Sequence, residues 1–404
     1  MKPISVINSA SNEQLLYFTS SSITSDDSCL IFISDRTGHP NIFVLDLGTG
    51  KERQLTFNRD GYLRTYKYFL GAHKKGLAKA GIALDEDRKL IYYILGMQIR
   101  CVDISGNDRV LAQYPEDQSP AYIDVSHDGA RLCVPTIDER ALQGDFVKEN
   151  AAPYNIDKRV QDENLNSYIH VYDTGSGREI IREKVPKCWI THVQFCPTNR
   201  DLILYNNEWP SDCGVRRIWL WDGVEHRKLR TLSENRDRQD WVSHEMWEKN
   251  GEHIIYHGRY VRGDHFIGRM TKDGTDITEI MFPKNYTKYG HFTVGKSGYF
   301  LTDGYYEQAD IRNIKELLKK ILRLTASASR TSSNKGEWVS ILMVDWSKKT
   351  IKWFPLVKHN SDWLSEDYHP HPIFNHRHSA VFFTARQNNK RTIFKILLPD
   401  HMLG

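Results

Sequence analysis

The sequence predicts an all-β fold, a single seven-bladed β-propeller over residues 1–404. Three observations lead to this prediction. Short apolar strands alternate with polar turns along the chain, a pair of apolar residues with fixed spacing recurs seven times, and histidine occupies the same position in four consecutive repeats. Repetition of a strand-and-turn unit over this length is typical of propellers, in which each repeat forms one four-stranded blade.

The first repeat shows the unit most clearly. Residues 30–34 and 41–46 are rich in Ile, Leu, Phe and Val, which favours strands, and Gly38 and Gly50 mark the turns that follow them. Segments 99–103, 169–173, 218–222, 341–345 and 393–396 resemble the second of these strands. The chain is therefore predicted to form antiparallel meanders from end to end.

The repeats can be counted from their apolar anchors. In each unit an apolar residue precedes a polar turn, and a second apolar residue follows seven positions later. The pairs are Ile23/Leu30, Leu84/Ile91, Val125/Leu132, Phe195/Leu202, Trp247/Ile254, Val294/Leu301 and Phe374/Val381. Their uneven separation predicts two surface insertions: a Lys- and Gly-rich stretch near 67–79, and a helix followed by a Ser-rich loop near 309–335.

Composition narrows the class of protein. The net charge of +4 and pI near 8.5 suit a small anionic ligand, but they are too mild for a nucleic-acid-binding face. No stretch approaches the roughly 18 apolar residues of a membrane span, and residues 1–10 lack the apolar run of a secretory signal. The six cysteines lack metal-type spacing and most lie in apolar strands, so we expect buried thiols and a cytoplasmic protein.

One position of the repeat carries a column of histidines. Three residues before the first anchor of each unit stand, in order, Ser20, Gly81, Tyr122, His192, His244, His291 and His371. His369 lies two residues before His371, so strand alternation places both on one face. Because the innermost strands of a propeller line its central channel, these side chains should form a ring, and converging imidazoles favour a metal or catalytic site.

The segment from Glu366 to Pro372 has unusual local chemistry. Pro370 and Pro372 restrict the backbone around His369 and His371, although proline is unfavourable inside a sheet. A local preference that is overridden in this way is typical of functional sites. Glu366 or the following Asp367 is close enough in sequence to offer an oxygen ligand.

These residues resemble the oligogalacturonate lyases of polysaccharide lyase family 22. The resemblance covers most of the chain and is sharpest at residues 215–219, 243–247, 290–291 and 369–374, the last being the string His-Pro-His-Pro-Ile-Phe. It implies an enzyme that cleaves short pectin fragments by β-elimination with a divalent metal, most often Mn²⁺. The expected partner is a short anionic uronic-acid oligosaccharide, with no nucleic acid or membrane, and the oligomeric state is open.

The resemblance also implies a role for each site residue. His291, His369 and His371 correspond to the three histidine ligands of the metal, and Glu366 stands where the family has a glutamine ligand. His244 corresponds to the catalytic base and Arg217 to the arginine that stabilises charge. We expect His192, Arg216 and Tyr122 to line the substrate site.

The chemistry of a uronate independently favours these residue types. Removal of the C5 proton requires the neighbouring carboxylate to be neutralised, which a metal and an arginine can do, and a histidine can accept the proton. Two alternatives remain open: a lyase for another uronic-acid oligosaccharide, and a non-catalytic propeller that serves as a binding module. A peptidase propeller is disfavoured because the chain contains no Gly-x-Ser-x-Gly motif.

Overall fold

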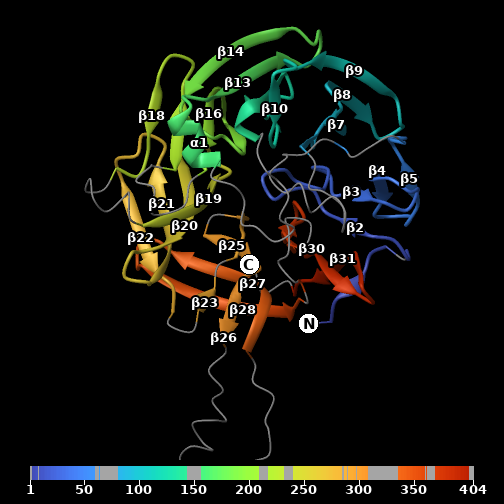
Figure 1. Ribbon diagram of the computed structural model, residues 1–404. Helices are drawn as coiled ribbons and strands as arrows, with labels where there is room; N and C mark the ends of the chain where they lie inside the picture. The colour runs from blue at the N-terminus through green and yellow to red at the C-terminus, as the bar shows by residue number, and fades with distance from the viewer. Residues whose placement is uncertain are drawn as a thin grey trace, which may run out of the picture.

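The computed structural model describes residues 2–7, 9–59, 63, 81–142, 156–208, 217–231, 240–283, 286–288, 290–296, 298–307, 335–359, 361 and 369–399. Within these ranges the chain forms seven antiparallel blades, as predicted. The blades follow one another around a ring, so that the last blade, β29–β31, comes to lie beside the first, β2–β5 (Figure 1).

In the first four blades the strands run from the channel outward in sequence order. Blade 1 contains β2 (Glu13–Gln14), β3 (Cys29–Ser34), β4 (Asn41–Asp46) and β5 (Glu52–Gln54). Blade 2 contains β6 (Ile82–Asp85), β7 (Leu90–Leu95), β8 (Gln98–Asp103) and β9 (Asp108–Gln113). Blade 3 contains β10 (Gln118–Pro120) and β11 (Asp124–Val125), both paired with β12 (Arg131–Asp138), then β13 (Asn166–Asp173) and β14 (Glu179–Pro186). Blade 4 contains β15 (Val193–Cys196), β16 (Asn199–Asn206), β17 (Ile218–Trp221) and β18 (His226–Lys228).

The remaining blades complete the ring. Blade 5 contains β19 (Trp241–Trp247), β20 (His253–Arg259), β21 (His265–Thr271) and β22 (Ile277–Met281). Blade 6 contains β24 (Phe292–Val294), β25 (Tyr299–Thr302), β27 (Lys335–Asp345) and β28 (Thr350–Lys358), with β23 (Tyr286–Lys288) and β26 (Tyr305–Glu307) extending it. Blade 7 contains β29 (Ile373–Phe374), β30 (Ala380–Gln387), β31 (Lys390–Leu397) and β1 (Ile4–Ser5). Two short helices, η3 (Glu139–Leu142) and α1 (Ile156–Asp162), lie in the connection between β12 and β13.

The apolar anchors read from the sequence are cross-strand partners in five of the seven blades. Ile23, for example, pairs with Leu30, and Trp247 pairs with Ile254. Blades 4 and 6 differ by one residue, because Phe195 pairs with Ile203 and Val294 pairs with Phe300. In blade 4 the shift accompanies a bulge at the end of β15, which adds a residue to the turn.

Apolar side chains hold the ring together at the blade interfaces. A separate buried cluster lies between each blade and the next, and one of these joins blade 7 to blade 1 through Phe382, Ile393, Leu30 and Phe32. Burial of this apolar area is the main favourable contribution to folding. The core therefore lies between the sheets, and the channel side of each inner strand remains available for polar side chains.

The closing blade contains strands from distant parts of the chain. β1 pairs with β31, so that residues near the start of the sequence form the outer edge of blade 7. On the inner side, Asp27 of blade 1 accepts hydrogen bonds from the Asn375 side chain at 2.9 Å and from the backbone N–H groups of His376 and Arg377 at 2.7 and 3.1 Å. One carboxylate thus connects the first and last blades.

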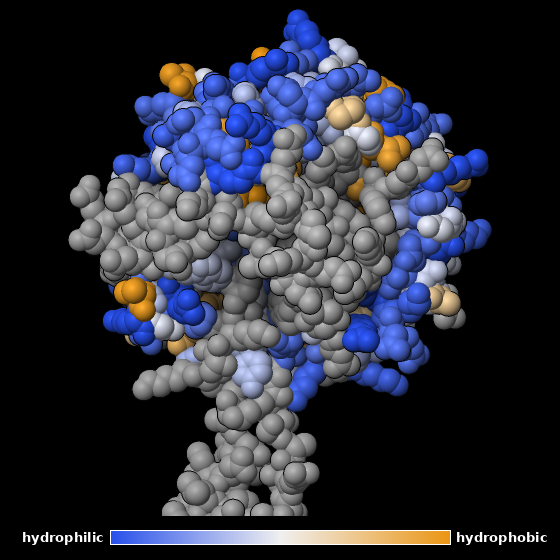
Figure 2. All heavy atoms as spheres, viewed as in Figure 1, coloured by the Kyte–Doolittle hydropathy of each residue, from blue (hydrophilic) through white to orange (hydrophobic). Residues whose placement is uncertain are grey.

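The surface and the cysteines agree with the composition. The described residues in Figure 2 are mostly hydrophilic on this face, with scattered apolar side chains. Five cysteines, Cys29, Cys101, Cys133, Cys188 and Cys196, are buried and unpaired, as expected, and Cys213 lies outside the described residues. No helix in the described part of the chain is both long enough and apolar enough to cross a membrane.

Both predicted insertions fall outside the described residues. The stretch near 67–79 is among them, and so is the segment near 309–335 except for Lys335, where β27 begins. Their structures stay predictions.

Replacement of Asp27 should weaken ring closure. We expect Asp27→Ala to lower the free energy of unfolding by about 2–4 kcal/mol, because three donors in blade 7 lose a charged acceptor. Asp27→Asn should retain more than half of the contribution, since asparagine keeps an acceptor and tolerates the positive φ of 58° at this position. Urea denaturation of the three proteins measures the difference. Equal stability of Asp27→Ala and the parent protein would contradict a closing role.

Candidate metal centre and active site

The predicted column of histidines forms a cluster at one level of the channel. Its members lie in the inner strands of blades 4 to 7 or just before them. Since these strands surround the channel axis, the histidine side chains meet there. The rings of His244 and His291 stack with centroids 4.4 Å apart, and those of His291 and His371 meet edge-on at 4.3 Å. A parallel bridge between Tyr122 and His192 places the neighbouring blades at the same level.

Three of these histidines can share one ion. One ring nitrogen from each of His291, His369 and His371 lies within 4.8 Å of the others. His291 and His371 are buried and His369 is half-buried, so the group is reached from one side. Imidazole nitrogens at this spacing fit a first-row divalent metal, which prefers such ligands. Glu366, the predicted fourth ligand, lies outside the described residues.

The backbone at His371 has a rare conformation, which the sequence did not predict. His371 has a φ of 42°, in the left-handed region that residues with a side chain rarely adopt. Pro370 makes no strand ladder, but its carbonyl accepts a hydrogen bond from the Thr384 N–H at 2.9 Å, and β29 begins only after the second proline. The segment therefore adds its two histidines to the channel without interrupting a sheet. His244, with a φ of 53°, has the same rare conformation.

A buried carboxylate, Asp303, orients His291. Its Oδ2 lies 3.1 Å from Nδ1 of His291, and its Oδ1 accepts the His291 backbone N–H at 2.6 Å. Burial alone would raise the pKa of Asp303, but the positive charge and hydrogen bonds of His291 lower it overall. A carboxylate on the far nitrogen fixes the tautomer of a metal-binding histidine and directs its Nε2 to the metal.

The sequence reasoning did not identify Asp303 or His359, whose Nε2 donates to the Asp303 carbonyl at 2.8 Å. A signal for Asp303 did exist. The β24–β25 hairpin pairs Phe292 with Thr302, so residue 303 must lie opposite residue 291. The sequence reasoning lacked only the register of this hairpin, because Val294 pairs with Phe300 and not with the predicted Leu301.

His244 stands beside the three histidines but binds a different partner. Its Nδ1 lies 2.9 Å from Nε2 of His257 on β20, which the sequence reasoning also missed. Burial first, and then the charges of neighbouring histidines, hold the pKa of both rings well below the usual value. When His257 accepts this hydrogen bond, the proton of His244 is on Nδ1 and its lone pair is on Nε2.

Arg217 lies between two carboxylates, the buried Glu245 and the half-buried Glu208. Its Nε and Nη1 are each 2.9 Å from an oxygen of Glu245 and of Glu208, respectively. The second oxygen of Glu245 lies 2.8 Å from Nε2 of His192. Burial opposes the charge on Glu245, but Arg217 and His192 outweigh it and lower its pKa to about 2. The structure thus brings the predicted residues Arg217 and His192 together through Glu245, which the sequence reasoning did not select, and Glu208, also not selected, pairs with Arg217 alone.

An aromatic pair lies on the channel axis, against the histidine rings. Tyr17 and Phe18, in the loop after β2, project into the channel where the column would place Ser20. The Phe18 ring lies 5.0–6.3 Å from the rings of His192, His244, His291 and His371. Tyr17 stacks on Tyr122 with centroids 3.7 Å apart, and both rings are buried. The predicted substrate residue Tyr122 therefore also packs against this pair, and Arg216 lies outside the described residues.

The chain has the same overall fold as two oligogalacturonate lyases. One, solved in complex with manganese, superposes with a TM-score of 0.73 and 19% identity over 99% of this chain and 94% of its own length. The other, from Vibrio parahaemolyticus, gives a TM-score of 0.73 and 19% identity over 98% and 93%. An acylaminoacyl peptidase from Pyrococcus horikoshii is similar at a TM-score of 0.55 and 11% identity, over 96% of this chain and 53% of that one. At these identities the likeness shows the seven-bladed propeller fold.

Sequence comparison adds a short local match. The Tol-Pal system protein TolB of Campylobacter jejuni is 40% identical over 62 residues, which is 15% of this chain and 15% of TolB. No family model matches the chain.

The histidine cluster predicts metal binding that can be measured directly. We expect the purified protein to bind Mn²⁺, and His291→Ala or His371→Ala to weaken this binding at least tenfold. Asp303→Asn should weaken it by about tenfold, because an orienting carboxylate contributes about 10–100-fold to metal affinity. Isothermal titration and metal analysis give the affinities.

The control for the metal experiment is His226→Gln. His226 lies on β18 and contacts Tyr205 and Glu183, away from the cluster. Unchanged Mn²⁺ affinity in His291→Ala would show that the cluster is not the binding site.

The low pKa of Glu245 predicts a stability that depends on pH. Since its pKa is lowered on folding from 4.5 to about 2, Glu245 stabilises the fold fully above the unfolded value, and this contribution is lost as the pH falls toward 2. Near pH 7, Glu245→Gln should lower the free energy of unfolding by about 3 kcal/mol, because Arg217 loses a buried partner. The difference between the two proteins, measured by denaturation from pH 7 to pH 3, should narrow below pH 4.5. A difference that widened on acidification would contradict this assignment.

Proposed function

We propose that the protein is a lyase that cleaves short oligogalacturonides by metal-assisted β-elimination. One observation carries the proposal: His244 does not belong to the three-histidine group, although its ring centroid lies only 4.4 Å from that of His291. A base next to a metal site, but outside its ligand set, is the arrangement that proton abstraction from a uronate requires. The fold shared with two oligogalacturonate lyases, one of them holding manganese, supports the proposal.

The histidine group fits a divalent metal by the chemistry of its donors. His291, His369 and His371 would hold it, with Glu366 as the proposed fourth ligand, and we propose Mn²⁺ as the ion. A bound metal supplies a Lewis acid that neutralises the substrate carboxylate and lowers the free energy of charge developing next to it. Asp303 keeps Nε2 of His291 directed to this position.

His244 then carries out the proton transfer. Its hydrogen bond to His257 holds the ring in place and favours the tautomer with a lone pair on Nε2. Nε2 accepts the C5 proton, the C5–H electron pair becomes the C4–C5 double bond, and the C4–O bond breaks. The leaving oxygen takes a proton from water, and the hydroxide that remains takes the proton from His244, so the products are an unsaturated uronate and a shortened oligosaccharide.

Arg217 exerts a weaker net positive field on a substrate than an unpaired arginine would. Glu245 and Glu208 both pair with it, so most of the charge that attracts the uronate must come from the metal. We propose that Arg217 stabilises the developing charge at short range, where its hydrogen bonds matter more than its net field. His192, Arg216 and Tyr122 remain proposed substrate contacts. The proposal places the enzyme in the cytoplasm, as expected from the sequence.

The test is to incubate the protein with di- and trigalacturonate and Mn²⁺ and to follow absorbance from the new C4–C5 double bond. We expect turnover by the parent protein, and a loss of about 10²–10⁴-fold in kcat for His244→Ala, the usual contribution of a general base. Metal content should be unchanged in His244→Ala. His226→Gln is the matched control and should retain full activity.

Three outcomes would contradict parts of the proposal. Reaction only with another uronic-acid oligosaccharide would change the substrate but keep the chemistry. Failure with every uronate would favour a non-catalytic binding module. Loss of metal in His244→Ala would show that this residue belongs to the ligand set.

A further inference from the structure

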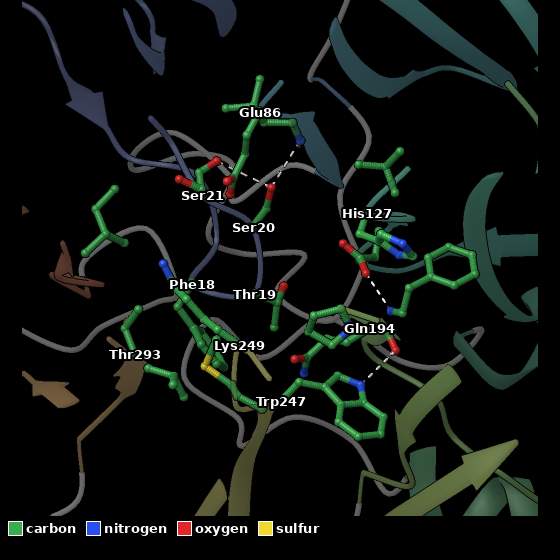
Figure 3. A pocket seen from close by; sticks show the side chains of 18 of the residues that line it. Phe18, Thr19, Ser20, Ser21, Glu86, His127, Gln194, Trp247, Lys249 and Thr293 are labelled. Carbon is green, nitrogen blue, oxygen red and sulfur yellow. Dashed lines mark hydrogen bonds between the residues drawn. The ribbon is translucent and has the colours of Figure 1, made fainter. Parts of the chain in front are cut away.

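A cavity lies in the channel on the side of Phe18 away from the histidine cluster. It has a volume of about 420 Å³, and residues from all seven blades line it. These residues follow the inner-strand histidines in sequence, as Trp247 follows His244 and Thr293 follows His291, so the cavity lies further along the same strands. In Figure 3, Glu86 and Ser20 face Trp247 across the cavity, and Thr293 and Gln194 lie on facing sides. Its volume is that of a small-molecule site.

Phe18 separates this cavity from the histidines. Its ring contacts four histidine rings on one side and lines the cavity on the other. The Phe18 side chain is only 2% exposed, so it fills the channel axis between the cavity and the histidine rings. A ligand in this cavity is therefore distinct from a substrate at the proposed active site.

Negative charge dominates the cavity lining. The carboxyl groups of Asp85, Glu86, Asp87 and Asp124 stand against one ammonium group, that of Lys249. Part of this charge is already paired, because Glu86 lies 3.2 Å from Nε2 of His376 and Asp85 lies 3.7 Å from Nη1 of Arg88. Asp124 accepts the Phe195 N–H at 2.7 Å. Burial raises the pKa of Asp124 to about 7, and no cation in the described part of the chain offsets this effect. Such a lining repels an oligouronide and attracts a cation.

The arrangement does not suit a bare metal ion. In the described part of the chain, only His291, His369 and His371 bring three ligand atoms of this kind within 4.8 Å. No three carboxyl groups of the described cavity residues come that close together. Carboxylates at this spacing fit a larger organic cation, whose other groups contact the rest of the lining.

Thr293 indicates what those other groups are. Its side chain is 9% exposed and lines the cavity, and its Oγ1 has no hydrogen-bond partner among the described residues. A buried hydroxyl without a partner costs about 1–3 kcal/mol, which a ligand hydroxyl can recover. Trp247, Phe195 and Phe374 offer apolar faces to a ring.

We propose that this cavity binds a small hydroxylated organic ammonium ion of the size of an amino sugar. Its ammonium group pairs with Asp124 and Glu86, a hydroxyl bonds to Thr293 Oγ1, and its ring lies against the apolar wall. The site stands on residues that the proposed lyase chemistry does not use, so the two proposals fail separately.

Three sugars of equal ring size test the proposal on the full-length, metal-free protein: glucosamine, glucose and glucuronate, which differ in charge. The reporter is the ¹H–¹⁵N signal of the Trp247 indole, which lies in the cavity wall and donates to the Gln194 carbonyl at 3.4 Å. Glucosamine should shift this signal saturably at millimolar concentrations. Glucose should bind at least tenfold more weakly, and glucuronate should produce no shift.

Variants locate the site. Asp124→Asn should weaken glucosamine binding about tenfold while keeping an acceptor for the Phe195 N–H, and Thr293→Val should weaken it about fivefold, the loss of one hydrogen bond of about 1 kcal/mol. Glu225→Gln, in the exposed turn before β18, is the control and should bind as the parent does. The proposal is overturned if glucosamine gives no shift, if glucose binds equally well, or if both cavity variants bind glucosamine normally.

Discussion

Seven inner strands converge on one axis, and the space around that axis is too small for their side chains to avoid one another. This constraint decides which residues meet. Equivalent positions of neighbouring blades come into ring contact, as His244 and His291 do at 4.4 Å, although 46 residues or more of sequence lie between them. The apolar clusters between the blades hold the strands at this distance, so the geometry of the histidines depends on packing far from the channel.

The same convergence places charges where water is scarce, and the charges beside the histidines are each held by a partner. Asp303 is paired with His291, and Glu245 is shared between Arg217 and His192. Buried charges persist only when they are paired and hydrogen-bonded. This requirement explains why the rings of His291 and His192 have defined orientations before any ligand binds. It also explains why glutamates of the protein compensate part of the positive charge of Arg217.

Much of this organisation was readable from the sequence, because the repeat is local. The anchor spacing follows from a turn of fixed length, and it was right for five blades; in blades 4 and 6 the turn and its register differ by one residue, which composition does not reveal. The histidine column followed from the same spacing, since a shared strand position gives a shared level in the channel. The partners Asp303, His257 and Glu208 were not predicted, because each depends on how one strand registers with another.

The aromatic pair at Tyr17 and Phe18 shows the limit of reading a repeat. Blade 1 departs from its siblings at this level: the expected column residue Ser20 instead bonds the Leu84 N–H at 3.1 Å, and the preceding aromatics take its place near the axis. A difference of two or three residues in one loop thus changes what fills the centre of the molecule. No average over the other blades contains that information.

The Phe18 ring lies on the channel axis, with the histidine cluster on one side of it and the cavity on the other. One side chain at the axis therefore separates a ligand held by the histidines from a ligand held in the cavity.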